Sequence, residues 1–250
     1  MIKFFRKIRQ QLLSEGKTGK YLKYAIGEII LVVIGILIAL SINNWNENRK
    51  NKRQLHGYLI SISKNIESDK TEISNIKNLR IRHNLAAQDY MQCVYKDSMS
   101  LQLLMRVAPI LGEKYLNVNK TGFDALKNSG FLANLQGSKI EDAILNYYSF
   151  YEEIHESETS MNNFIENMES ALYYDDYENV SRVFKFLNDI QTQKELSEQD
   201  IRLALKHIYR NSKMLGVMQR VADEKYFSVY DSLEVKGQKI TALIEKEINN

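Results

Sequence analysis

The chain has 250 residues, a formal net charge of +3, one proline and one cysteine. The lone Cys93 excludes an intrachain disulfide and a zinc cluster built on thiolates. Residues 1–24 carry seven Lys or Arg and one acid, a net charge of +6, so the rest of the chain is net −3. Because the positive charge is confined to the N-terminus, the composition argues against a nucleic-acid-binding domain. The scarcity of proline and of turn signals favours an all-α protein.

Residues 1–23 predict a basic amphipathic leader on the cytoplasmic face of a membrane. Ile2, Phe5, Ile8 and Leu12 fall near one face of a helix. The Lys and Arg residues between them can meet anionic headgroups, so membrane lipid is an expected partner.

Residues 24–45 form an apolar run in which Glu28 is the only charged residue. A helix of this length spans roughly 33 Å, compared with about 30 Å for the hydrocarbon core of a bilayer. Asparagines and Trp45 close the run like an interfacial boundary, which favours an uncleaved transmembrane helix. The alternative is a signal peptide, for which Ala39-Leu40-Ser41 offers a cleavage site.

Basic residues are more frequent before this run than after it. Seven precede it, and four follow it closely: Arg49, Lys50, Lys52 and Arg53. The positive-inside rule then predicts a cytoplasmic N-terminus and an extracytoplasmic C-terminal domain.

Within the run, four residues recur at every fourth position: Gly27, Leu31, Gly35 and Ala39. Small residues at this spacing let helices approach closely, and a carboxyl such as that of Glu28 favours a protein-facing site in a membrane. These five residues predict association with a second copy or with another integral membrane protein. In the alternative interpretation, Glu28 reaches the inner interface near Lys20 or Lys23.

Two segments carry a resemblance to other proteins. The sequences MIKFFRKIR and YAIGEIILVVIGILIALSINNWNE, within residues 1–50, resemble the start of a family of uncharacterised bacterial single-pass membrane proteins. LKNSGFLANL, from Leu126 to Leu135, is similar to a turn in the same family. The resemblance implies a bacterial envelope protein anchored in the cytoplasmic (inner) membrane. It implies no activity, because the family has none established.

Residues 46–250 predict an extracytoplasmic α-helical domain, an antiparallel bundle of long amphipathic helices. From Leu55 onward, apolar residues recur three and four apart, with Asp69 and His83 on the same row. The less regular segment that follows predicts one short helix at 101–107. A helix from Thr121 to Leu135 is expected to break at Asn128-Ser129-Gly130.

The clearest helix is expected to run from Ser138 to Leu172. Ser138 and Glu141 have the spacing of a capping box, and apolar residues follow in a regular three-four alternation. A shorter helix is predicted at 179–190.

Ser197 and Asp200 predict the cap of a final long helix that continues to Ile244. Gly216 and Gly237 are its expected weak points.

Charge is segregated between these helices. From Ile140 to Ser181 there are eleven acids and no Lys or Arg. Complementary bundle faces with a solvated stripe explain this pattern, and so does an acidic docking surface for a basic partner or a cation. The residues of this candidate surface are Glu152, Glu153, Glu156 and Glu158.

Motifs for catalysis are incomplete. Glu152-x-x-His155 is one half of a di-iron pattern, which needs a second pair. Ser61-Ile-Ser-Lys64 matches the Ser-x-x-Lys of penicillin-recognising enzymes, but the edge strand that those enzymes need is not predicted. We therefore predict no enzyme activity, no metal and no cofactor.

The sequence thus predicts a non-enzymatic, membrane-anchored envelope protein that acts as a scaffold, adaptor or accessory subunit through its extracytoplasmic helical domain. The alternative is a ligand-sensing subunit. Because only 23 residues precede the span, such a sensor would signal through a partner membrane protein. Expected partners are membrane lipid and either a second copy, giving a homo-oligomer, or another integral membrane protein, and no nucleic acid.

Overall fold

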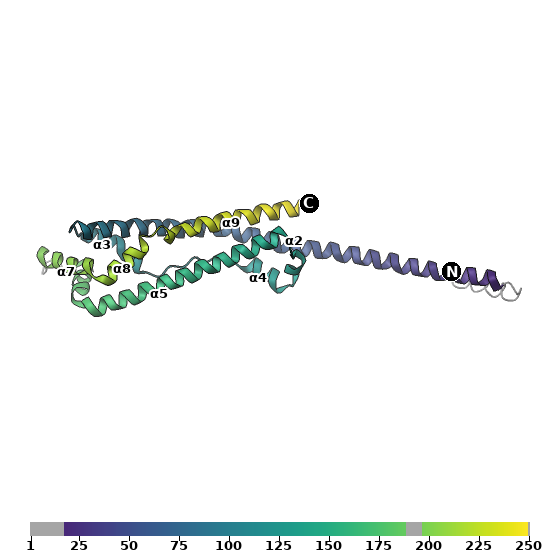
Figure 1. Ribbon diagram of the computed structural model, residues 1–250, viewed down its shortest axis with the longest axis horizontal. Coiled ribbons are helices and arrows are strands. Elements are labelled where there is room, and N and C mark those ends of the chain that lie inside the picture. Colours follow the sequence, from purple (N-terminus) through teal and green to yellow (C-terminus); the bar gives the residue numbers. More distant parts are fainter. Residues whose placement is uncertain (1–17, 189–196, 250) are drawn as a thin grey trace. The chain divides into compact units, whose positions relative to one another are not determined.

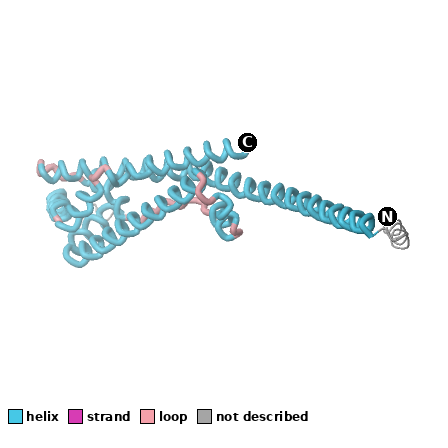
Figure 2. The backbone as a smooth tube through the Cα atoms, turned by 45° about the vertical axis from the view of Figure 1, so that its right-hand side comes forward, coloured by secondary structure: helices cyan, strands magenta, loops and turns pink. Residues whose placement is uncertain are grey.

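The described part of the chain is helical, as the composition predicts (Figure 1). The computed structural model describes residues 18–188 and 197–249, so most of the predicted leader lies outside the described residues. Figure 2 shows helices joined by a few loop segments and no strand in these two ranges. The chain divides into two compact units, Met1–Gly57 and Tyr58–Asn250. The helical body predicted for 46–250 therefore corresponds to a unit that begins at Tyr58.

The first unit contains the apolar run as part of α2 (Thr18–Tyr95). This is the one helix of the described residues that is long and apolar enough to cross a membrane, and its most apolar window has no buried residue. A membrane anchor and a signal sequence share this length and composition. The large apolar side chains of the run are exposed, which is the surface that lipid or a protein partner covers in a membrane helix.

In the second unit, α2 buries one face of the helix. The buried apolar residues are three, four or seven apart over most of the row: Leu59, Ile62, Ile66, Ile73, Ile76, Ala87 and Tyr90. Asp69 and His83 are buried as well, as their positions in the sequence pattern predict. Arg80 and Asn84 of α2 are buried too, so four polar side chains of this helix enter the core of the unit.

Four short helices follow α2. Their bounds are α3 (Leu101–Val107), η1 (Ala108–Leu111), α4 (Thr121–Asn128) and η2 (Phe131–Leu135). The predicted helix at 101–107 is confirmed, and Ser100 Oγ caps it by accepting from Leu103 N at 3.1 Å. The predicted break between α4 and η2 is confirmed too, with Gly130 at φ +76°, a conformation that favours glycine.

The long helix α5 (Lys139–Asn188) joins two helices that the sequence separates. Only Asp176 departs from helical geometry, at φ −140° and ψ 33°, so a local break replaces the predicted gap. Ser138 Oγ accepts from Glu141 N at 3.2 Å, as a capping box requires. The Glu141 carboxylate, however, accepts from Gly137 N at 2.7 Å, so the predicted box is formed on one side only.

The predicted final helix is wrong as one element, because it is divided into α7 (Glu198–Arg210), α8 (Ser212–Val221) and α9 (Lys225–Ile248). The Ser197–Asp200 capping box of α7 is confirmed. Asn211 Oδ1 caps α8 by accepting from Lys213 N at 2.8 Å. In the turn before α9, whose N-cap Glu224 makes no such bond, Asp223 Oδ1 accepts from Lys225 N at 2.9 Å. Gly216 and Gly237, the expected weak points, lie inside α8 and α9.

The second unit is built around α2, α5 and α9. Two sets of contacts give the helix directions. A Cβ added at Gly237 would meet Ile66 and Tyr147, and Arg80 contacts both Glu158 and Tyr226. These pairs show that α9 runs antiparallel to α2, whereas α2 and α5 run in the same direction. Figure 1 shows α9 lying beside α5, and α7 and α8 pack against the later part of α5.

Two glycines mark close approaches between these helices. A Cβ at Gly122 of α4 would lie 2.8 Å from Ile62 N and 2.9 Å from Ser61 C, both main-chain atoms of α2. A Cβ at Gly237 would meet only side chains, with Ile66 Cγ2 at 2.9 Å. The helix α4 therefore touches the backbone of α2 directly.

Candidate functional site

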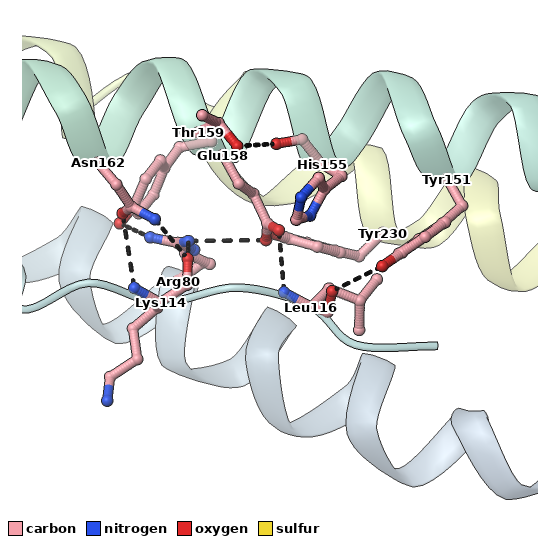
Figure 3. Close-up of polar contacts among 10 residues, drawn as sticks. Arg80, Lys114, Leu116, Tyr151, His155, Glu158, Thr159, Asn162 and Tyr230 are labelled. Carbon is pink, nitrogen blue, oxygen red and sulfur yellow. Dashed lines mark hydrogen bonds and ion pairs between the residues drawn. The ribbon is translucent and has the colours of Figure 1, made fainter. Parts of the chain in front are cut away.

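A pair of opposite charges is buried where α2, α5 and α9 meet. Arg80 of α2 is 2% exposed and Glu158 of α5 is 5% exposed, and Arg80 Nη2 lies 3.6 Å from Glu158 Oε1. Figure 3 shows the two side chains pointing toward one another across the interior. Charges in such a place are stable only when hydrogen bonds satisfy their remaining atoms.

The Glu158 carboxylate is satisfied on both oxygens. Oε1 accepts from the Tyr230 hydroxyl at 2.6 Å, and Oε2 accepts from Leu116 N at 2.9 Å (Figure 3). Burial raises the pKa of Tyr230, and the nearby Glu158 charge adds to this effect. The phenol therefore keeps its proton and remains a donor to Glu158 at neutral pH.

The Arg80 guanidinium has partners from two other segments. Nη2 donates to Lys114 O at 2.9 Å, and Nη1 donates to the Tyr226 hydroxyl. The guanidinium also lies over the Tyr226 ring, 4.6 Å from its centroid. Its Nε atom is buried without a hydrogen-bond partner among the described residues.

The irregular segment between η1 and α4 is held by polar side chains of α2 and α5. Asn162 Nδ2 donates to Lys114 O at 3.1 Å, and the Tyr151 hydroxyl donates to Leu116 O at 3.3 Å. Farther along the segment, the buried Asp69 carboxylate accepts from Asn119 N at 3.0 and 3.1 Å. Because an unpaired buried main-chain group costs free energy, these side chains replace the hydrogen bonds that a helix would supply.

A pocket of ≈230 Å³ lies between α5 and α9 beside the charged pair. Arg80, Glu158, Tyr226 and Tyr230 line it, together with apolar residues that include Phe150 and Met161. A small molecule in this pocket would meet a positive charge, a negative charge and two phenol hydroxyls. We refer to these four polar residues as the Arg80–Glu158 site.

The predicted acidic surface is only partly exposed. Glu152, Glu153 and Glu156 lie on the outside of α5, and Glu152 pairs with Lys120 Nζ at 2.8 Å. Glu158 was wrongly placed on this surface, because it points into the core and binds the groups described above. The use of the remaining acids for docking stays a prediction.

The residues predicted for association within a membrane lie on the exposed surface of α2. Gly27, Leu31, Gly35 and Ala39 are exposed, and Glu28 is half-buried. A Cβ added at Gly27 or Gly35 would meet no atom within 4 Å, so this side of the helix has room for a close neighbour. Association there stays a prediction.

His83, one turn after Arg80, is buried in a positively charged environment. Burial, together with the charges of Arg80, Arg82 and Lys114, lowers the pKa of His83 from 6.5 to about 4. The imidazole is therefore neutral at pH 7 in the folded protein.

Folding stability is expected to fall between pH 6.5 and pH 5 because of His83. In this range the unfolded chain binds a proton at His83 and the folded chain does not, so acid favours unfolding by about 2 kcal/mol. Urea titrations of the full chain in mild detergent at several pH values measure this slope. A His83→Phe variant should show a flatter profile, even if its stability at pH 8 differs. The buried Asp69, whose pKa burial raises, is present in both proteins and cancels in the comparison. Equal slopes in the two proteins would contradict this role of His83.

Comparison with known proteins gives one match. No curated protein and no solved structure matches the chain significantly. The model of a family of unknown function, DUF6090, matches residues 28–166, more than half of the 250 residues. The matched range begins at Glu28 and includes Arg80, Leu116 and Glu158. The expected membership of an uncharacterised family is thereby confirmed, and the chain belongs to DUF6090, a family of unknown function.

Proposed function

We propose that this protein is a non-enzymatic, membrane-anchored protein of the bacterial envelope that binds a partner protein through its helical body. It would act as a scaffold, adaptor or accessory subunit. The apolar run of residues 24–45 would be the anchor in the inner membrane, with the N-terminus in the cytoplasm and the helical body outside it. The exposed apolar surface of this run and the excess of basic residues before it support that arrangement.

The observation that carries the proposal is an apolar groove in the second unit. It has a volume of ≈340 Å³ and lies between the α3–η1 segment and the second half of α5, with α7 and α8 contributing Ile208 and Met214. No charged residue lines it. Phe184, which lines it, is 61% exposed, and Met105 and Tyr173 are exposed as well. Large apolar side chains gathered at one groove mark a binding surface for a protein.

The charges around the groove indicate what binds there. Most of its lining comes from two segments, 101–111 and 180–188. These segments carry Arg106, Arg182 and Lys185 and no acid. The groove therefore fits an amphipathic helix of a partner protein, with large apolar side chains three and four residues apart and acidic residues at the edges.

Photo-crosslinking tests this proposal in the full-length protein at its native expression level. A photoreactive phenylalanine analogue at Phe184 should form an adduct with one other protein, and mass spectrometry should place the adduct on an acidic amphipathic helix. The double charge reversal Arg182→Glu with Lys185→Glu should remove most of this adduct. The same analogue at Tyr95, an exposed aromatic outside the groove, is the matched control. An adduct with only lipid or a second copy at Phe184, or equal yields at both positions, would contradict the proposal.

The second candidate function is a ligand-sensing subunit that signals through a partner membrane protein. The observation that favours it is the pocket at the Arg80–Glu158 site, since a ligand there would touch α5 and α9 together. Native mass spectrometry of the full chain released from mild detergent tests this candidate. A retained small molecule that the Tyr230→Phe variant loses would support it, and a mass equal to that of the bare chain would speak against it.

A further inference from the structure

A separate pocket lies between α2 and the α3–η1 segment. Its volume is ≈300 Å³. Four apolar residues line it: Leu79, Leu85, Ala86 and Pro109. The other lining residues are His83, Arg82 and Arg106. The pocket shares no residue with the Arg80–Glu158 site, and it shares only Pro109 with the apolar groove.

His83 is the buried polar group of this pocket. It is 4% exposed, and neither ring nitrogen has a hydrogen-bond partner among the described residues. Buried polar atoms are nearly always paired, because each unpaired one loses its interaction with water without replacement. A neutral imidazole has one N–H donor and one acceptor nitrogen, so a ligand in the pocket could pair with it.

The charges at the pocket are positive. Arg82 has no ion pair with any residue that the structure describes. Arg106 donates through Nη2 to Asp89 at 3.0 Å, and its guanidinium has further N–H groups. No acid is among the lining residues. The positive charges of Arg80 and Lys114, which act on His83, add to the same potential.

We propose that this pocket binds a small organic carboxylate. Its carboxylate would lie between Arg82 and Arg106, with His83 as a hydrogen-bond partner. Its apolar body would pack against Leu79, Leu85 and the other apolar residues of the pocket. Two guanidinium groups suit a carboxylate, and apolar walls suit an organic body better than an inorganic anion. The site does not depend on the partner-binding function proposed above.

A ligand-observed ¹⁹F NMR titration tests the site. The probe is 4-(trifluoromethyl)benzoate, added to the full chain in phosphatidylcholine nanodiscs, with empty nanodiscs to subtract binding to lipid. The probe should bind at millimolar concentration or below, and its neutral amide should bind at least about tenfold more weakly. Unlabelled benzoate should displace the probe, and inorganic phosphate should do so poorly. Absence of probe binding, equal binding of the amide, or equally good displacement by phosphate would overturn the proposal.

Variants locate the probe in this pocket. Arg82→Gln should weaken binding by about tenfold or more, since one charge-assisted hydrogen bond is lost. This variant leaves the fold intact because Arg82 is exposed and forms no ion pair with the described residues. Arg202→Gln removes one positive charge from an exposed position on α7 and is the matched control, with affinity unchanged. Equal affinities of the two variants would show that the probe binds elsewhere and would overturn the assignment.

Discussion

Replacement of Glu158 by alanine is expected to destabilise the helical body by about 3–5 kcal/mol, the usual loss when one partner of a buried ion pair is removed. The substitution leaves Arg80 buried without its counter-charge, because the nearest other partners are a carbonyl and a phenol. Leu116 N and the Tyr230 hydroxyl lose their acceptor in the same step. Each of these groups adds its own desolvation cost. Urea unfolding of the full chain in mild detergent, followed by far-UV circular dichroism, measures the loss.

Three further variants separate charge from packing at this position. Glu156→Ala, on the exposed side of the same helix, is the matched control and should change stability by no more than about 0.5 kcal/mol. Glu158→Gln keeps an acceptor and should fall between the control and Glu158→Ala. The double variant Arg80→Met with Glu158→Leu should cost less than the two single losses added together, since no charge remains buried. If Glu158→Ala unfolds at the same urea concentration as Glu156→Ala, the buried pair does not contribute as described.

Replacement of Gly122 by alanine is expected to cost about 3 kcal/mol, the upper end of the range for overpacking. The added Cβ would lie 2.8 Å from Ile62 N and 2.9 Å from Ser61 C, which belong to the backbone of α2 and cannot turn aside. Moving α4 away would also stretch the 2.8 Å hydrogen bond from Gly122 N to Asn65 Oδ1. The same urea titration measures this effect.

Two other helical glycines serve as controls for Gly122. Gly237→Ala should cost less, because the atoms that its Cβ would meet, Ile66 Cγ2 at 2.9 Å and Tyr147 Cε2 at 3.3 Å, belong to side chains and not to the backbone. Gly216→Ala should stabilise α8 by about 0.5–1 kcal/mol, since the nearest atom is Phe164 Cζ at 3.8 Å and alanine is the better helix former. An order other than Gly122, Gly237, Gly216, from most to least destabilising, would contradict the close approach of α4 to α2.

The elements that the sequence predicts well depend on local signals. The helix at 101–107, the break at Gly130 and the cap at Ser197 each follow from residues within one or two turns of the position concerned. The burial of Asp69 and His83 also follows from a local pattern, because they interrupt an apolar row at regular spacing.

The prediction of one final helix is wrong because it relies on apolar periodicity alone. Apolar spacing continues from Ile201 to Ile244 because α7, α8 and α9 all bury side chains in the second unit. Periodicity alone therefore does not reveal the two breaks. Two side chains at the breaks do reveal them: Asn211 and Asp223 both accept from main-chain N–H groups two residues later, and both are residue types that favour turns and helix starts.

The Arg80–Glu158 site was missed because its members are distant in sequence. Glu158 stands in the apolar row of α5 and is buried, although the run of acids around it predicts a place on the acidic surface. The groups that hold it are on α2, on the segment before α4 and on α9. A buried acid in an amphipathic row predicts that a buried cation exists, but a single sequence does not say which of 34 Lys and Arg residues it is.

The long-range contacts of Arg80 have a consequence for the biogenesis of the protein. Arg80 meets Tyr226, 146 residues later, and Asn84 donates to Val221 O, 137 residues later. During synthesis, α2 therefore emerges long before the residues that complete its polar centre. Before α9 is made, Arg80 and Glu158 lack their hydrogen bonds to Tyr226 and Tyr230, so we expect the incomplete chain to be more open and more easily cleaved by proteases. A chain truncated before α9 is therefore expected to lack native packing of this polar centre.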